Sequence, residues 1–465
     1  MHDIAEKVVS MASGCDYADV RIENVTGDSI ILKNGDPITV GVTRNTGMCI
    51  RILVKGSLGI SFTNDFSNKA MKEAVDRAVK LAKSSANIVK NPVHMSKETP
   101  VKGKFSVKEK RKLLDVTVQE KMGELISLDK TLVSTNLNFA TRFFDLSTEC
   151  REKYYCNSEG SRISSYTPRL GLFCLVSVKS TDTEQRMEQF GNSGGWEFFN
   201  KWDLHNKLVE EAKMLAKLPS MPSMKKEIMD VVLSPELVGI ASHESCGHPY
   251  EADRILGREA ANAGGSFVTK KSIGTRIGSK IVNLVDDPTV KDSYGFYLYD
   301  DEGVKARKRY LIKGGMINEL LQNRETAVDF GVKSNASSRA NSWAAEPIVR
   351  MANTFVEPGD HTFEEIIDVK KGVYIKSYME WNIDDKRFNQ RYVGLEAYEI
   401  KNGSLEGLVK RPALEITTPA FWAAVDAVGK DFELIVGNCG KGEPMQSIPV
   451  GFGGPHIRLH NVMLG

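Results

Sequence analysis

Residues 243 to 248 read His-Glu-Ser-Cys-Gly-His, which places two imidazoles next to a carboxylate. Two imidazoles can hold a divalent metal ion, and a neighbouring glutamate can take a proton from water bound to that ion. The chain has only eight histidines among 465 residues, so chance produces this arrangement in roughly 1% of chains of such composition. The segment therefore indicates a metal centre that hydrolyses a carbonyl compound.

The spacing of the two histidines constrains the backbone between them. Residues 234–236, Ser-Pro-Glu, have the cap, the first-turn proline and the acidic first turn of a starting helix. Five residues of a regular helix rotate by about 140°, so His243 and His248 would not share a face. The rings converge if the turn is wide or if the helix ends between them. Gly247 followed by Pro249 favours the second, because proline disfavours helical geometry at the residue before it.

Two histidines leave a catalytic zinc ion one protein ligand short. The candidates for the third ligand are Glu251, Asp253, Cys246, His456, His460 and Cys439. Cys439 stands out, because Gly437 and Gly440 let the backbone approach a metal closely and the preceding segment, DFELIVG, predicts a strand. Glu244, beside the first ligand, is predicted to be the general base.

The composition narrows the class of protein. Apolar residues make up 41% of the chain, and the net charge of +2 is too small to favour nucleic acid or an anionic membrane. We find neither a basic amino-terminal signal region nor an apolar run near the ~20 residues of a membrane span. Seven scattered cysteines without a Cys-x-x-Cys spacing argue against a disulfide scaffold. We therefore expect a cytoplasmic globular enzyme.

The first 221 residues predict an α+β domain with an internal repeat. Short strand-like segments from residue 18 to residue 62 lead into an amphipathic helix at 67–86 with a cap at Ser67. The same order recurs later, so we expect a strand meander plus a helix to be duplicated in residues 17–88 and 131–220.

We place a domain boundary near residue 222, because LPSMPSMKK is rich in proline and lacks periodicity. Residues 222–465 contain glycine-punctuated strand candidates, among them KIVNLVDD, GFYLYDD and FELIVGNCG, and helical segments near 235–258, 321–330 and 418–428. Clustered strands predict an α+β fold, and we expect a mostly antiparallel, curved sheet in this domain to carry the metal site.

The chain also resembles a known family. The segments YADVRIE, LGISFTND, HESCGHPYEADR, VDDPTVKDSYGFYLYDDEG, RMANTFVEPGD and GNCGKGEPMQSIPVGFGGPHIRL extend over nearly its whole length. They are similar to the TldD/PmbA family, in its metal-bearing TldD branch. The last of these segments is the most specific.

The resemblance implies a cytoplasmic zinc metallopeptidase with one Zn2+ per chain. His243, His248 and Cys439 would be the zinc ligands and Glu244 the catalytic base. The substrate would be a peptide or an unfolded polypeptide, and the enzyme would be a homodimer or a heterodimer with a related subunit. The chain departs from the family at residues 341–344, Asn-Ser-Trp-Ala, where relatives often carry Glu-Ser-Tyr, which argues against a substrate contact there.

Several residues and two other functions stay open at this point. Glu251 and Asp253 either orient a ligand or pair with Arg254, whereas His456 and Arg458 either contact substrate or are structural. Cys246 is expected to pack in the core. The metal motif is also compatible with a zinc hydrolase of small-molecule amides, and the metal-free branch of the family allows a non-catalytic assembly or regulatory subunit.

Overall fold

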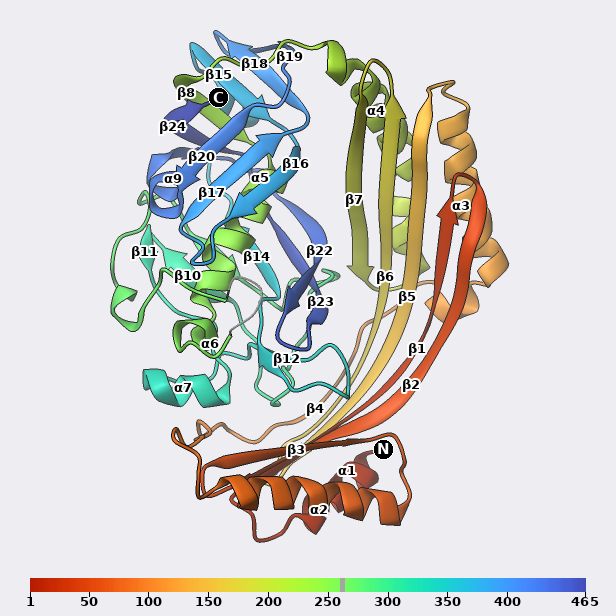
Figure 1. Cartoon of the computed structure of the whole chain (residues 1–465), viewed down its shortest axis with the longest axis vertical. Helices are drawn as coiled ribbons and strands as arrows, with labels where there is room; N and C mark the ends of the chain where they lie inside the picture. The colour runs from red at the N-terminus through yellow and green to blue at the C-terminus, as the bar shows by residue number, and fades with distance from the viewer. Residues whose placement is uncertain (260–263) are drawn as a thin grey trace.

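The first half of the chain forms one long, curled sheet. The computed structural model describes residues 1–259 and 264–465. The seven-stranded sheet has the order β3-β2-β1-β5-β6-β4, and β7 pairs with a later stretch of β6. Figure 1 shows these strands bending around the second half of the molecule as a half-barrel. The strands are β1 (Tyr17–Lys33), β2 (Asp36–Val54), β3 (Ser57–Thr63), β4 (Lys102–Ser106), β5 (Phe139–Asn157), β6 (Arg162–Lys179) and β7 (Thr183–Ser193).

Two similar units build this sheet. Strands β1 to β3 lead into α2 (Asn68–Ser85), and strands β5 to β7 lead into α4 (Leu204–Lys217). Because β1 and β5 pair in antiparallel register, the two units meet at the centre of the sheet. We propose that this pseudo-symmetry reflects the duplication expected from the sequence.

Helices cover the convex face and the lower end of the sheet (Figure 1). Helices α3 (Val118–Val133) and α4 pack apolar side chains such as Leu125 and Leu208 against the strands. Helices α1 (His2–Met11) and α2 pack at the lower end. The oxygen of Ser67 accepts from the amide of Ala70 at 3.2 Å, so Ser67 caps α2 as the sequence predicts. None of the described helices is long and apolar enough to cross a membrane.

The second half of the chain forms two main sheets around a shared core, beside the small two-stranded pair of β12 and β13. The nine-stranded sheet has the order β16-β17-β20-β24-β8-β15-β18-β19, with β21 beside β24, and the six-stranded sheet has the order β11-β10-β9-β14-β23-β22. Most pairs in both are antiparallel, with parallel pairs β8/β15 and β14/β23. Helix α5 contacts both sheets, which places the start of the HESCGH segment between them.

The elements of the second half have the following bounds. The strands are β8 (Glu227–Leu233), β9 (Leu284–Asp286), β10 (Arg309–Lys313), β11 (Met316–Ile317), β12 (Ser338–Arg339), β13 (Ile348–Val349), β14 (Asn353–Val356), β15 (Lys371–Ile375), β16 (Tyr378–Ile383), β17 (Asn389–Gly394), β18 (Ala397–Lys401), β19 (Ser404–Leu408), β20 (Ala413–Thr417), β21 (Val425–Val428), β22 (Glu433–Lys441), β23 (Gln446–Gly454) and β24 (Ile457–Leu464). The helices are α5 (Pro235–Ser242), α6 (Ala252–Ile255), α7 (Arg324–Phe330), α8 (Phe363–Ile367) and α9 (Thr418–Ala424).

One predicted strand is wrong. The segment GFYLYDD, residues 295–301, forms turns and a single bridge between Tyr299 and Lys305. Its tyrosines contact other parts of the molecule: Tyr299 packs over Gly103 of the first half, and the hydroxyl of Tyr297 donates to a buried carbonyl at 2.7 Å. Tyr299 therefore packs between the two halves, whereas Tyr297 is held within the second half.

Loops of the second half pack onto the long sheet through buried charges. Arg51 on β2 pairs with Glu302 at 3.0 Å, and the fully buried Arg21 on β1 donates to two carbonyls of the loop 342–345. Trp343 of the same loop donates from its indole nitrogen to Asn45 at 2.8 Å. The segment that departs from the family pattern is thus a contact between the two halves of the chain.

A side chain at Gly47 should weaken this contact. A Cβ there would lie 2.3 Å from the ring of Trp343, so Gly47→Ala should cost about 1–3 kcal/mol of unfolding free energy through overpacking. Gly41→Ala on the same strand is the control, because nothing lies within 4 Å of its added Cβ. Denaturant unfolding measures both effects. Gly47→Ala should cost much less in a Trp343→Ala background, and equal costs in both backgrounds would contradict the proposed clash.

Candidate metal centre

A widened helical turn brings the two histidines together. Helix α5 starts at a Ser234 cap, and a π-helical turn over His243–Gly247 follows it. The amide of His248 bonds to the carbonyl of His243, five residues back, so the spacing of five fits one wide turn. The ring centroids lie 4.9 Å apart. The expectation that the helix ends between the histidines is wrong, because His248 keeps helical dihedral angles despite the proline after it.

Gly247 lies where this turn meets the side chain of Met351 in the core. A Cβ at this position would lie 1.9 Å from the sulfur of Met351. The glycine therefore permits the wide turn to pack closely against its neighbour, rather than ending the helix.

Cys439 reaches the same point from strand β22, at the edge of the six-stranded sheet. Its sulfur lies 3.5 Å from Nε2 of His248, and one ligand atom from each of His243, His248 and Cys439 falls within 4.8 Å of the others. All three side chains are buried. The structure thus brings together three residues that the sequence analysis singled out, and two of them, His248 and Cys439, are 191 positions apart in the chain.

The protonation states of these residues fit a metal site. Burial lowers the pKa of both imidazoles, which favours the neutral form that binds a metal. Burial raises the pKa of the Cys439 thiol, but His248 and Arg350 lower it by more, to a net value of about 7. A substantial fraction of Cys439 is therefore thiolate near neutral pH.

The donor set and one of the donor separations also fit zinc. Tetrahedral zinc with these ligands requires donor separations of about 3.3–3.6 Å, and the bond between Cys439 and His248 has this length. Nδ1 of His243 is buried without a hydrogen-bond partner among the described residues, which is costly unless a ligand completes the site. Two imidazoles and one thiolate match the nitrogen and sulfur ligands that zinc prefers.

Glu251 orients the second histidine. Its Oε2 lies 3.0 Å from Nδ1 of His248, which leaves Nε2 of that ring directed at Cys439. The same oxygen accepts from Arg254 at 2.7 Å and lies 3.2 Å from the ammonium of Lys441. Burial raises the pKa of Glu251, but Lys441 and His248 lower it by more, so the carboxylate stays ionised. Asp253 binds Lys441 at 2.7 Å and does not reach the ligands.

Glu244 faces the cavity beside the ligands and forms a close ion pair with Arg387. Cys246 lies elsewhere, with its sulfur 3.9 Å from the hydroxyl of Ser245, and burial raises its pKa far above the usual value. Cys246 is thus a packing residue, as expected.

Sequence reasoning missed Arg387 and Lys441. The spacing from Cys439 to Lys441 on one strand was the only available signal for the latter.

The two candidates near the carboxyl end differ in position. His456 lines the same cavity and is held by Asp431 at 2.7 Å and by the hydroxyl of Tyr374 at 3.0 Å. Arg458 pairs with Asp426 at 2.9 Å and is not among the residues that line the cavity. His456 is therefore placed where a substrate could meet it, and Arg458 is not.

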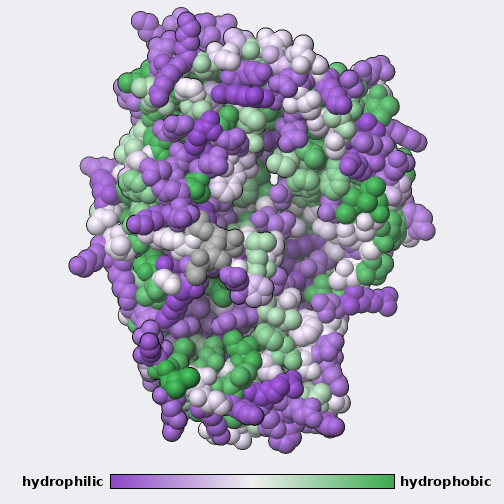
Figure 2. All heavy atoms as spheres, in the orientation of Figure 1, coloured by the Kyte–Doolittle hydropathy of each residue, from purple (hydrophilic) through white to green (hydrophobic). Residues whose placement is uncertain are grey.

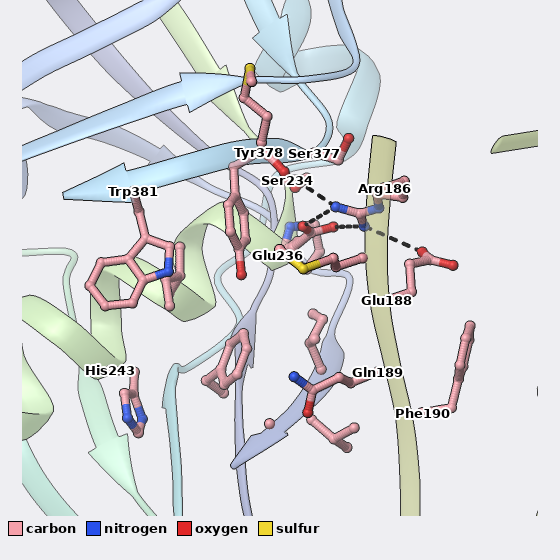
Figure 3. A pocket seen from close by; sticks show the side chains of 18 of the residues that line it. Arg186, Glu188, Gln189, Phe190, Ser234, Glu236, His243, Ser377, Tyr378 and Trp381 are labelled. Atoms are coloured by element: carbon pink, nitrogen blue, oxygen red, sulfur yellow. Dashed lines mark hydrogen bonds and ion pairs between the residues drawn. The ribbon is translucent and has the colours of Figure 1, made fainter. Parts of the chain in front are cut away.

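The metal site opens into a cavity of about 1400 Å³ between the two halves of the chain. Strand β7 of the long sheet lines one side, and β22, which carries Cys439, lines another. Figure 3 shows Arg186 on β7 reaching across to Glu236 in the first turn of α5, and these side chains pair at 2.7 Å. The face seen in Figure 2 is hollowed where the two halves meet.

Comparison with known proteins gives the class of protein that this fold and site define. Residues 18–82, 111–218 and 226–465 match domain 1, the central domain and the C-terminal domain of the PmbA/TldA metallopeptidase models. The class is therefore a metallopeptidase built from these three domains. The chain belongs to the PmbA/TldD family, as its sequence motifs indicate.

Related proteins from several organisms match almost the whole chain. A metalloprotease of Methanothermobacter thermautotrophicus is 33% identical, covering 97% of this chain and 95% of its own length. A zinc metalloprotease TldD homolog of Saccharolobus solfataricus is 25% identical over 97% of each chain. Among solved structures, TldE of Thermococcus kodakarensis matches 99% of this chain and 100% of its own at a TM-score of 0.75 and 17% identity. A putative modulator of DNA gyrase from Thermotoga maritima, with a TM-score of 0.80 and 16% identity over 100% and 99% of the two chains, shares the same fold.

Two buried cysteines provide a matched test of the ligand set. Cys439→Ala should lose zinc, because it removes one of three ligands, whereas Cys246→Ala should keep it. Elemental analysis of the purified variants beside the wild type gives the zinc content per chain. Equal zinc content in the two variants would rule out Cys439 as a ligand.

Replacing the carboxylate that orients His248 should weaken zinc binding without removing a ligand. Glu251→Gln should lower zinc affinity by about 10–100-fold. Competition with a chromophoric chelator measures this affinity. The control is Asp230→Asn, which alters a similar contact to the exposed His460 at 2.8 Å and should leave zinc affinity unchanged. Wild-type affinity in Glu251→Gln would mean that the carboxylate does not orient the ligand.

Proposed function

We propose that this protein is a zinc-dependent metallopeptidase that hydrolyses peptides or unfolded protein segments. The observation that carries this proposal is the convergence of His243, His248 and Cys439 beside the carboxylate of Glu244 in one internal cavity. The family and its relatives named metalloproteases support the same activity.

The residues have distinct roles in the proposed reaction. A zinc ion held by His243, His248 and Cys439 would polarise the scissile carbonyl and lower the pKa of a bound water to about 7. Glu244 takes a proton from the attacking water and then delivers it to the leaving amine. Glu251 keeps the His248 ring in place throughout.

The edges of two strands favour an extended substrate. Strand β7 pairs only with β6, and β22 pairs only with β23, among the described strands. Both therefore present unpaired backbone groups, and both line the cavity that holds the metal ligands. An extended peptide could add to such an edge through its own backbone, which would give a broad sequence preference. The cavity between the two halves would admit a single chain more readily than a folded domain.

The two alternative functions predict different substrates and metal contents. A zinc hydrolase of small amides would cleave those compounds in preference to unfolded protein. A non-catalytic assembly or regulatory subunit would not need the side chain of Glu244 beside three metal ligands. We propose that the protein acts in the cytoplasm as a homodimer or with a related subunit, and the shared fold with TldE is compatible with a related partner.

Glu244→Gln should separate metal binding from catalysis. The amide cannot accept the proton, so the rate of peptide cleavage should fall by about 10²–10⁴-fold while zinc content stays at the wild-type level. The assay uses an unfolded protein, short peptides and small amides side by side. A chelator should abolish cleavage by the wild type, and added zinc should restore it.

The control for this variant is Glu415→Gln, which alters an exposed ion pair on β20 and should leave cleavage unchanged. Full peptidase activity in zinc-loaded Glu244→Gln would refute the general-base role. If the protein cleaved only small amides, these compounds and not peptides would be its substrate class.

A further inference from the structure

Arg387 lies at the tip of the β16/β17 hairpin in a conformation that the hairpin imposes. Its φ angle is 65°, in the left-handed region that few side chains favour. The carboxylate of Asp384 accepts from the amides of Phe388 at 2.8 Å and Asn389 at 3.0 Å, which closes the turn. The carbonyl of Arg387 accepts from the hydroxyl of Thr418 at 2.8 Å. The turn is therefore held on both sides and directs one side chain inward.

The guanidinium group of Arg387 has fewer partners than its burial requires. The residue is only 6% exposed, and among the described residues it forms one ion pair, through Nη1 with Glu244. Its Nε is enclosed without a hydrogen-bond partner among the described residues. An enclosed donor without a partner is costly, and an anion in the adjoining cavity would offset that cost.

The position of the Arg387 guanidinium indicates which anion it could bind. Arg387 lines the same cavity as Glu244 and the three candidate metal ligands, and its charge acts on both His243 and His248. The group is thus close to where the scissile carbonyl of a substrate must lie.

We propose that Arg387 is a catalytic residue that binds the oxyanion formed when water attacks the scissile carbonyl. This inference rests on the proposed peptidase function and adds a second electrophilic group to it. The water oxygen forms a bond to the carbonyl carbon, its proton passes to Glu244, and the carbonyl π electrons move onto oxygen. The proton then passes to the amine nitrogen, the C–N bond breaks with its electron pair on nitrogen, and the carbonyl re-forms.

The ion pair with Glu244 fixes the position of the guanidinium. It holds the positive charge of Arg387 beside the carboxylate that faces the cavity, before any substrate binds. Donors placed in advance for developing charge are among the most effective contributions to catalysis.

The test uses the zinc-loaded full chain and Arg387→Gly, because glycine adopts the left-handed conformation without strain. We expect kcat to fall by about 10²–10³-fold with little change in KM, and the affinity for a phosphinic peptide that mimics the tetrahedral intermediate to fall in parallel. Zinc content should not change. Guanidinium salts at non-denaturing concentrations should restore part of both losses, which a purely structural role would not produce.

Two further variants keep the test decisive. Arg391→Gly removes an exposed arginine from the same hairpin and should behave as the wild type. If Arg387→Gly does not fold, Arg387→Lys should still lower kcat at least about tenfold, because an ammonium cannot reproduce the planar fork.

The possible results distinguish the role of Arg387 from the proposed peptidase function. Wild-type kcat and wild-type affinity for the phosphinic peptide in the zinc-loaded Arg387 variants would overturn the role of Arg387 alone. A zinc-loaded wild type that neither cleaves peptides nor binds the phosphinic peptide would overturn the peptidase function as well.

Discussion

The candidate metal centre depends on one buried carboxylate that links a helical turn to a distant strand. Glu251 contacts His248 on the turn, and it also contacts Lys441, two residues beyond Cys439 on β22. Removing one partner of a buried charge cluster leaves the others uncompensated, at a cost of roughly 3–5 kcal/mol. Glu251 and Lys441 hold the two segments together, and neither belongs to the group of two histidines and one cysteine. These three candidate ligands can therefore lie close together without a bound metal.

The sequence predicted most of the site and less of its surroundings. His243, Glu244, His248 and Cys439 could be identified because their types are rare, their spacing is short or glycines flank them, and the family motif extends over them. Arg387 could not, because an arginine in a hairpin tip looks like any surface residue until the turn is seen to point inward. The wide turn was one of two options, and the influence of Pro249 was overestimated because the π-helical bond already satisfies the backbone there.

The fold class was predictable from the grouping of strands and helices, and the Ser67 cap correctly marked the start of α2. The failure at residues 295–301 has a physical reason. Alternating aromatic residues have the same pattern whether they line a strand or fill the space between two sheets, and only the tertiary contacts distinguish the two. Likewise, the pairing of β1 with β5 at the centre of the sheet joins residues more than 100 positions apart, which local patterns do not encode.

The π-helical turn contains one residue more than a regular helical turn. This extra residue limits which insertions and deletions the segment between the two histidines can accept. Deleting one position between the imidazoles would restore a spacing of four, at which a regular helix presents both rings on one side. The chain after it would then rotate by about 100°, and Glu251 would swing away from the ring that it supports. A change in the spacing of the two histidines therefore also changes the contact between Glu251 and His248. For this reason, a single-residue insertion or deletion cannot convert the motif with a spacing of five into the motif with a spacing of four, or the reverse.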